Sequence, residues 1–278
     1  MKFLTYVPKS YLSWGLGHLA RLPLPRPLAR FSISLFAQAY CIDPTLATKP
    51  LESFNSIGAF FTRDLRAELR PIGEGLVCPV DGTLRSCSDI SPNAEVTQVK
   101  GKLYKVSRLL GEDRLAAQCL EGQLWNFYLS PQDAHHIHSP VDGKIVRTVH
   151  IPGKLWPVND WALNSIEGLF VTNERVITFI ESDLGLIAVV MIGATNVGRI
   201  KLAYAAIETN RYPWRAQKQT SIEHAQPIAV ARGDKLGTFK MGSSVVVVSE
   251  RKLFNLAGAK CPAKVQYGRI LQDYISEG

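Results

Sequence analysis

Three histidines within four positions form the densest group of chemically versatile side chains in the sequence. His135, His136 and His138 lie in a short segment that ends at Pro140, and they make up half of the six histidines in the chain. If this segment is extended, His136 and His138 share one face and His135 points to the other. Imidazoles in such a cluster can bind a metal ion, exchange protons or contact a phosphate. The alternative is a set of exposed polar side chains before a turn.

Two further positions could join this chemistry. Asp81 lies in a P-V-D-G turn, where a carboxylate either bonds its own backbone or orients a histidine. Ser243 follows Gly242 directly and precedes the apolar run at 245–248. A serine hydroxyl becomes a useful nucleophile only with a base, and in isolation a Gly-Ser step is a turn that enters a buried strand. The residues alone leave these alternatives open.

The elements that must position these residues are mostly β-strands. From about residue 76, short β-rich runs alternate with turn residues, and apolar β-branched stretches indicate buried strands. The predicted strands include residues 124–129, 144–151, 175–181, 186–192 and 244–249. We therefore predict an α+β fold that is mainly β. Residues 73–278 form the compact β-rich catalytic domain, and residues 1–72 form a helical N-terminal region.

One turn sequence occurs twice. Residues 79–84 and 140–145 share P-V-D-G-x-[LI]. An Asp-Gly pair supports a tight turn because glycine readily adopts positive φ. The repetition predicts a duplicated β unit, and the alternative is chance recurrence of a common turn.

The N-terminal segment has a composition of its own. Residues 1–40 mix apolar, aromatic and basic side chains and contain no Asp or Glu, and the prolines at 23, 25 and 27 divide the segment into two short helices. Amphipathic helices of this kind suit the interface of an anionic membrane. The alternative is a helical hairpin packed on its own domain.

Net charge, known binding motifs and cysteine content limit the classes of partner and compartment that we expect. The net charge of +8 favours an anionic partner, either nucleic acid or a membrane surface. The sequence has no Gly-rich phosphate loop, RNA-binding aromatic motif or helix-turn-helix signature, so we expect no nucleic-acid partner. The five cysteines include no C-x-x-C pair, which predicts free thiols in a reducing compartment. We also expect no secretory signal and no membrane-spanning helix.

Taken together, six segments in order resemble the phosphatidylserine decarboxylase family over most of the chain. They are F-F-T-R-D-L at 60–65 with R-P at 70–71, C-P-V-D-G at 78–82, D-A-H-H-I-H-S-P at 133–140, N-E-R at 173–175 after Phe170, V-M-I-G-A-T-N-V-G at 190–198, and F-K-M-G-S-S at 239–244. The chain departs from the family pattern at three positions. Met241 and Ser244 replace a Leu and a Thr, and Ala134 replaces a Tyr.

The resemblance implies a self-cleaving proenzyme. Ser243 would attack the Gly242 carbonyl, and the chain would split into a long chain, 1–242, and a short chain, 243–278. Ser243 would thereby become a covalent pyruvoyl group, which acts as an electron sink by forming a Schiff base with the substrate amine. His138 would be the base for this step, oriented by Asp81, in the logic of a Ser-His-Asp triad.

Other expectations also follow from the resemblance. His135 would lie near the substrate and assist decarboxylation, His136 is given no role, and no metal is implied. The reaction would convert phosphatidylserine to phosphatidylethanolamine and CO2. The enzyme would be a heterodimer of its long and short chains, which is expected to pair further as a homodimer. It would be bound peripherally to anionic phospholipid, at the cytoplasmic face of a bacterial plasma membrane.

Three alternatives make different predictions. A zinc metallohydrolase could use Asp81, His136 and His138 as ligands, and it would contain zinc in an uncut chain. A basic binding module would form no carbonyl adduct with hydroxylamine. A sister pyruvoyl decarboxylase would share the cleavage chemistry but act on another serine-headed lipid.

Overall fold

The structure is a computed structural model that describes residues 9–99, 102–111, 114–195, 199–210, 218–240 and 243–276. Met241 and Gly242, on one side of the predicted cleavage site, lie outside the described residues. Ser243 is described as the first residue of a strand. The site can therefore be followed on both sides of the Gly-Ser step.

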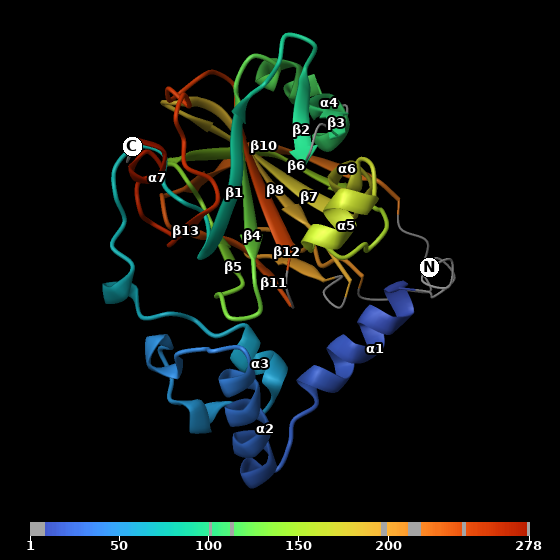
Figure 1. Cartoon of the computed structure of the whole chain (residues 1–278), viewed down its shortest axis with the longest axis vertical. Helices are drawn as coiled ribbons and strands as arrows, with labels where there is room; N and C mark the ends of the chain where they lie inside the picture. The colour runs from blue at the N-terminus through green and yellow to red at the C-terminus, as the bar shows by residue number, and fades with distance from the viewer. Residues whose placement is uncertain are drawn as a thin grey trace.

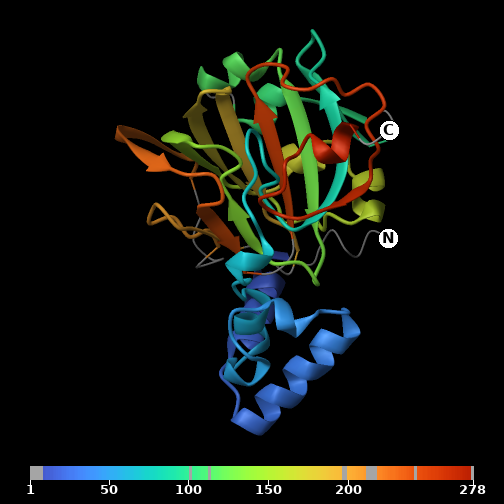
Figure 2. The same ribbon diagram turned by 90° about the vertical axis from the view of Figure 1, so that its left-hand side faces the viewer.

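A small helical part lies below a larger β-rich body in both views (Figures 1 and 2). The helical part contains α1 (Lys9–Arg21), α2 (Arg26–Ala39) and α3 (Ile57–Phe61). Pro25 precedes α2 directly, and Pro27 occupies its first turn, where a missing N–H costs no helical hydrogen bond. The predicted division of the N-terminal segment by prolines is confirmed. The short helices α4 (Val106–Leu109), α5 (Asp160–Ser165), α6 (Leu169–Thr172) and α7 (Asp273–Ser276) belong to the β-rich body.

The β-rich body is built on one large antiparallel sheet, which confirms the predicted mainly-β fold. Its strand order is β10-β6-β7-β8-β12-β4-β1-β13, beside a three-stranded sheet β5-β11-β9 and a hairpin β2-β3. The strands are β1 (Gly82–Asp89), β2 (Glu95–Val99), β3 (Lys102–Lys105), β4 (Gln123–Leu129), β5 (His136–His138), β6 (Gly143–Ile151), β7 (Arg175–Ser182), β8 (Gly185–Ile192), β9 (Ile200–Leu202), β10 (Thr220–Val230), β11 (Lys235–Phe239), β12 (Ser243–Ser249) and β13 (Ala263–Val265).

Strand β12 is the centre of the core. It pairs with β8 on one side and β4 on the other, and the four valines at 245–248 are all buried. Side chains on both faces of a strand are buried only when both faces of the sheet are covered. The residues that follow the Gly-Ser step are therefore fixed by packing from every side.

The two P-V-D-G turns occupy equivalent places in the large sheet. The first leads into β1 and the second into β6, and each strand lies second from an edge. A Cβ at Gly82 would lie 2.5 Å from the Tyr128 carbonyl oxygen, and one at Gly143 would lie 2.2 Å from that of Glu181. Glycine is therefore needed at both positions because the neighbouring strand passes so close.

Hydrogen bonds between the two turns are reciprocal. The His138 N–H donates to the Pro79 carbonyl oxygen (2.9 Å), and the Val77 N–H donates to the Pro140 carbonyl oxygen (3.0 Å). Val77 holds the same position before the first turn that His138 holds before the second, and Pro79 corresponds to Pro140. Each turn therefore makes the same hydrogen bond to the other. This reciprocity supports the predicted duplication, in which His138 takes the place that Val77 has in the other unit.

The two units have diverged at their aspartates. Asp81 pairs with Arg70 (2.7 Å), and Asp142 pairs with Arg232 (2.8 Å). The side chain of Asp81 is 10% exposed, whereas that of Asp142 is 60% exposed. Only the first unit thus provides a carboxylate that is shielded from water, where its charge acts more strongly.

Candidate active site

Strand β4 lies between β1, which directly follows Asp81, and β12, which begins at Ser243. Ser243 pairs with Leu129 at the end of β4. On the other side of β4, Gly82 approaches Tyr128 and Leu129 closely. Neighbouring strands are roughly 4.8 Å apart, so the backbones at Gly82 and Ser243 are on the order of 10 Å apart. The chain then runs from Leu129 through residues 130–135 to the histidines.

His136 and His138 lie on β5, which pairs with β11, the strand that precedes the Gly-Ser step in the sequence. In this pairing His136 faces Thr238 and His138 faces Lys235, and the Phe239 N–H donates to the His135 carbonyl oxygen (2.9 Å). Strand β11 ends at Phe239, and Ser243 begins β12 in the other sheet. The predicted cleavage site therefore lies in the short connection between a histidine-bearing sheet and the central strand of the core.

His138 is a buried, neutral imidazole. Its ring stacks on Tyr267 with 3.9 Å between centroids and an interplanar angle of 13°. Burial lowers the pKa of His138 to about 3, and nearby His136 lowers it further, against a raising effect of the Pro79 carbonyl. Its Nδ1 is buried and has no hydrogen-bond partner among the described residues. A neutral imidazole with an unbonded nitrogen has the chemical form that a general base requires.

Asp81 is held by other partners than His138. Its carboxylate accepts hydrogen bonds from Arg70 Nε (3.1 Å) and Nη2 (2.7 Å), and from the Tyr267 N–H (2.8 Å). In the described part of the chain, no hydrogen bond joins Asp81 and His138. Tyr267 contacts both residues, with its backbone on Asp81 and its ring on His138. The orienting role of Asp81 stays a prediction, and the structure shows Tyr267 as the link through which it could act.

His135 is completely buried, and its neighbours differ from those of His138. Its ring lies 3.9 Å from that of Phe61, and its Nδ1 is 2.8 Å from the Asp133 carbonyl oxygen. A carbonyl oxygen can only accept, so Nδ1 carries the proton and Nε2 is left as an acceptor. This Nε2 is buried without a partner among the described residues. Burial lowers the pKa of His135 to about 3.

His136 is engaged with its surroundings. Its Nδ1 is 2.9 Å from Thr238 Oγ1, and its Nε2 is 3.2 Å from an Asp64 carboxylate oxygen. The rings of His136 and His138 are 6.4 Å apart, in agreement with the predicted shared face. Burial lowers the pKa of His136 to about 4, with a further lowering by Lys235 and a raising effect of Asp64. These contacts fix the His136 ring between β11 and the segment that follows α3.

The zinc alternative receives no support from this arrangement. Within the ranges that the structure describes, no group of three or more His, Cys, Asp or Glu side chains is placed to hold a metal ion. Asp81, one of the three predicted ligands, is bonded to Arg70 instead.

A cavity of about 360 Å³ opens beside Asp81. Its lining includes Asp133 and Ala134 from the segment before the histidines, and Arg63 and Arg70 from the region after α3. Ala134 is the position where the family pattern has a tyrosine. The cavity is thus adjacent to the histidine segment, and the smaller alanine side chain leaves more of it open.

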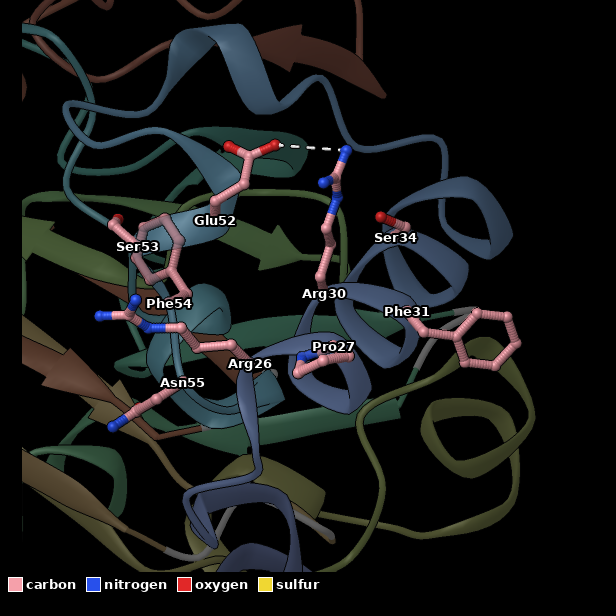
Figure 3. Close-up of a pocket in the computed structure, with 9 residues that line it drawn as sticks. All are labelled: Arg26, Pro27, Arg30, Phe31, Ser34, Glu52, Ser53, Phe54 and Asn55. Atoms are coloured by element: carbon pink, nitrogen blue, oxygen red, sulfur yellow. Dashed lines mark ion pairs between the residues drawn. The ribbon is translucent and has the colours of Figure 1, made fainter.

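A second, larger cavity of about 920 Å³ lies in the helical part, between α2 and residues 52–55 (Figure 3). Arg30 points toward Glu52, at 3.9 Å, while Arg26 lies near Phe54 and Asn55. This cavity has none of the predicted catalytic residues in its lining. It is therefore distinct from the site at the end of β4.

Comparison with known proteins decides the family. A family model described as phosphatidylserine decarboxylase matches residues 57–271. The chain is 37% identical to the phosphatidylserine decarboxylase proenzyme of Myxococcus xanthus (strain DK1622), over 91% of this chain and 89% of that protein. It is 39% identical to that of Anaeromyxobacter sp. (strain K), over 89% and 88%. This chain belongs to the phosphatidylserine decarboxylase family. The proenzyme of Brevibacillus brevis (strain 47 / JCM 6285 / NBRC 100599) is 34% identical over 88% of this chain.

The family segment at 60–65 supports the histidines, a role that the sequence did not indicate. Phe61 packs on His135, and Asp64 contacts His136. Arg63 Nη2 donates to the Gln132 carbonyl oxygen (2.7 Å) and so holds the connection between β4 and β5. The helical part is therefore tied directly to the segment that carries the predicted site histidines.

The N-E-R segment at 173–175 makes structural hydrogen bonds. The Asn173 amide bonds the backbone of Trp156 in both directions (3.0 and 2.8 Å) and donates to the Gly193 carbonyl oxygen (2.9 Å). The buried Arg175 donates to backbone carbonyls of Leu109 and Arg108. The N-E-R segment thus joins the start of β7 to the connection after β8 and to α4.

Basic side chains gather near the start of the Gly-Ser connection. The Lys240 N–H donates to the Arg199 carbonyl oxygen (3.0 Å). Burial lowers the pKa of Lys240; Glu208 raises it, and Lys201, Arg21 and Arg199 lower it. The positive charges of Lys201, Arg21 and Arg199 near Lys240 favour the binding of an anion beside them, although Arg199 also pairs with Glu208 (3.4 Å). Sequence reasoning had selected no phosphate-binding residue, and this group is the structural candidate.

Proposed function

We propose that this protein decarboxylates phosphatidylserine to phosphatidylethanolamine and CO2, through a pyruvoyl group made from Ser243 by self-cleavage. The observation that carries the proposal is the placement of the Gly-Ser connection between the sheet that bears the histidines and the buried strand β12. Family membership supports the substrate and the proenzyme state, because the relatives carry these words in their names.

Self-cleavage needs only the residues of this chain and one water molecule. The Ser243 hydroxyl attacks the Gly242 carbonyl carbon, and His138 accepts the hydroxyl proton and passes it to the departing Ser243 nitrogen, so that the C–N bond breaks and an ester replaces the peptide bond. Loss of the Ser243 α-proton then breaks the ester, leaving a carboxylate on Gly242 and a dehydroalanine at position 243. Water hydrolyses the latter, ammonia leaves, and chains 1–242 and 243–278 remain. Glycine at 242 suits this step because no side chain hinders the approach to its carbonyl.

Unpaired polar atoms support the proposal of a reactive carbonyl group at position 243. Eight buried side-chain polar atoms lack a hydrogen-bond partner within the described residues, and they include three that belong to the histidine segment or directly follow Ser243: His135 Nε2, His138 Nδ1 and Ser244 Oγ. An unpaired buried polar atom costs about 1–3 kcal/mol, so such atoms commonly have a partner in the working state. The pyruvoyl group supplies the electron sink for CO2 loss. His135 Nε2 is left to accept a hydrogen bond from the substrate, and the basic group around Lys240 to bind its phosphate.

The helical part is proposed to hold the protein on an anionic membrane. Its exposed apolar side chains lie on and around α1 and α2, namely Leu19, Leu22, Leu28, Phe31 and Leu35, each at least half exposed. In Figure 3 the Phe31 ring points away from the other labelled side chains. No helix in the described ranges is long and apolar enough to cross a membrane. Exposed apolar and basic side chains on short helices suit interfacial binding.

The membrane proposal is tested by sedimentation with vesicles. Phe31→Asp with Leu35→Asp is expected to reduce binding to vesicles of phosphatidylglycerol and phosphatidylcholine at least tenfold. Trp161→Asp is the matched control because Trp161 is also exposed, 46%, but lies on α5 in the β-rich body. Equal binding by wild type and the double variant would contradict the proposal.

The substrate is tested with defined lipids. Purified protein in mixed micelles should convert phosphatidylserine to phosphatidylethanolamine, with one CO2 released per product molecule, and Ser243→Ala should show no conversion. Hydroxylamine should inactivate the wild type by capturing its carbonyl group. Conversion of another serine-headed lipid with phosphatidylserine left unchanged would contradict the proposed substrate.

A further inference from the structure

Two of the five cysteines lie next to each other although they are far apart in the sequence. Cys87 is in β1, and Cys261 is in the connection between β12 and β13. Their sulfur atoms are 3.7 Å apart, and both residues are partly buried. A disulfide needs about 2.05 Å between its sulfur atoms, so the pair must close by less than ~2 Å.

Strand pairing explains why the two thiols meet. Strand β1 is antiparallel to β13 at the edge of the large sheet, with Leu84 opposite Ala263 (Figure 1). Beyond this pair, β1 continues toward Cys87 while the partner segment runs back toward Cys261. The meeting of the thiols therefore follows from the register of the sheet and is held by the backbone hydrogen bonds of β1 with β4 and β13.

We propose that Cys87 and Cys261 form a reversible disulfide, and that in the processed protein this bond joins the long chain to the short chain covalently. The second part rests on the proposed function, because Cys87 belongs to 1–242 and Cys261 to 243–278 only after cleavage before Ser243. The first part does not depend on cleavage, since the same bond would form within an intact chain.

The two thiols differ in pKa, and this difference determines which of them reacts first with an oxidant. A hydrogen bond from Cys87 lowers the pKa of Cys261 to about 7, although burial opposes this, and the same bond raises the pKa of Cys87. Cys261 is thus the thiolate that attacks first. By contrast, burial raises the pKa of Cys119 to about 12 and that of the buried Cys78 as well.

The oxidant is a low-molecular-weight disulfide such as oxidised glutathione. The Cys261 thiolate attacks one of its sulfur atoms, which forms a mixed disulfide and releases one glutathione thiolate. Cys87 gives its proton to that thiolate or to water and attacks Cys261 Sγ, which releases the second glutathione. Two protein thiols are oxidised, and one glutathione disulfide is reduced to two thiols.

The bond would matter because the short chain holds the core of the protein. It contains β12, which is paired on both sides and buried. Without a covalent link, unfolding of the processed protein releases this chain into solution. With the disulfide, the two chains stay together and refolding remains unimolecular.

The experiment is intact-mass analysis of denatured full-length protein after equilibration with oxidised glutathione, with and without subsequent reduction. We expect one species with the summed mass of both chains before reduction and two separate chains after it. Cys87→Ser and Cys261→Ser should each abolish the linked species, and Cys41→Ser, which changes an exposed cysteine, should retain it. Free short chain from the oxidised wild type, or linked chains in either of the first two variants, would overturn the proposal.

A protein that does not cleave is distinguished in the same experiment. The reduced sample would then show a single intact chain, which contradicts the proposed self-cleavage. The disulfide would still be detected as the loss of two hydrogen atoms from that chain, reversed by reduction and absent in Cys87→Ser. An uncut chain with no such loss of mass would overturn the disulfide as well.

Discussion

At the scale of single residues, the histidines of the site are neutral because they are buried. Burial lowers the pKa values of His135 and His138 to about 3. Both rings present a nitrogen without a hydrogen-bond partner among the described residues. A conventional histidine would be partly protonated near its ordinary pKa of about 6.5. These two stay neutral across the physiological range.

This burial predicts that the folded protein loses stability in acid. Below about pH 6.5 the unfolded chain binds protons on histidines that remain neutral in the folded state, so unfolding becomes more favourable as pH falls. Each histidine with a folded pKa of 3–4 should remove about 2 kcal/mol between pH 7.5 and pH 5. Urea unfolding across this range measures the slope, and His136→Gln should flatten it. A free energy of unfolding that is constant from pH 7.5 to 5 would contradict these pKa values.

The basic group at Lys240 predicts a separate effect on substrate binding. Lys240→Ala should raise KM for phosphatidylserine about tenfold and change kcat little, because a charge-assisted hydrogen bond contributes about 1.5 kcal/mol. Lys252→Ala is the control, since Lys252 pairs with Asp89 at the far end of β1. An unchanged KM with a lower kcat would show that Lys240 does not bind the phosphate. The measurement is steady-state kinetics in mixed micelles at fixed surface concentration.

At the scale of elements, the duplicated turns provide an internal control for the site. Gly82→Ala and Gly143→Ala each place a Cβ against a carbonyl oxygen of the neighbouring strand, at 2.5 and 2.2 Å. Both should destabilise the fold by about 1–3 kcal/mol. Only Gly82→Ala should also slow self-cleavage, because it displaces Asp81 and the end of β4. Pulse-chase analysis of chain splitting and denaturant unfolding measure the two effects; equal cleavage rates in both variants would contradict the assignment.

The elements also show what could be predicted from the sequence. The apolar run at 245–248 and the β-branched stretches correctly predicted β12 and its neighbours, because continuous burial leaves a continuous apolar pattern. The repeated P-V-D-G turn correctly indicated the two equivalent strands. The contacts of Tyr267 with Asp81 and His138 could not be predicted, because they join residues that only the register of β13 on β1 brings together. Arg70 and Asp64 belong to segments that resemble the family, but the sequence did not indicate that Arg70 contacts Asp81 or that Asp64 contacts His136.

At the scale of the whole molecule, the predicted cleavage would leave the central strand on a separate chain. The short chain would contribute β12 to the middle of the large sheet and β13 to its edge. The two products are thus interleaved and held by the full packing of the core. The division of the chain into a helical region, 1–72, and a catalytic domain, 73–278, stays a prediction, and so do the homodimer and the bacterial plasma membrane as its location.

This interleaving predicts that processing changes refolding. Under reducing conditions, processed wild type should recover from urea less completely as it is diluted, because two chains must meet again. Uncut Ser243→Ala should refold to the same extent at every protein concentration. Recovery is measured by tryptophan fluorescence over a hundredfold range of concentration. Equal, concentration-independent recovery of both proteins would mean that the short chain is not separate.

The most direct measurement is the denaturing, reducing intact mass of the purified protein. Wild type should give two masses, those of residues 1–242 and of residues 243–278 with the N-terminal serine converted to pyruvoyl. Ser243→Ala should give one intact mass, and Ser244→Ala should still split at least in part. A single intact mass for the folded wild type, or splitting in Ser243→Ala, would contradict the account.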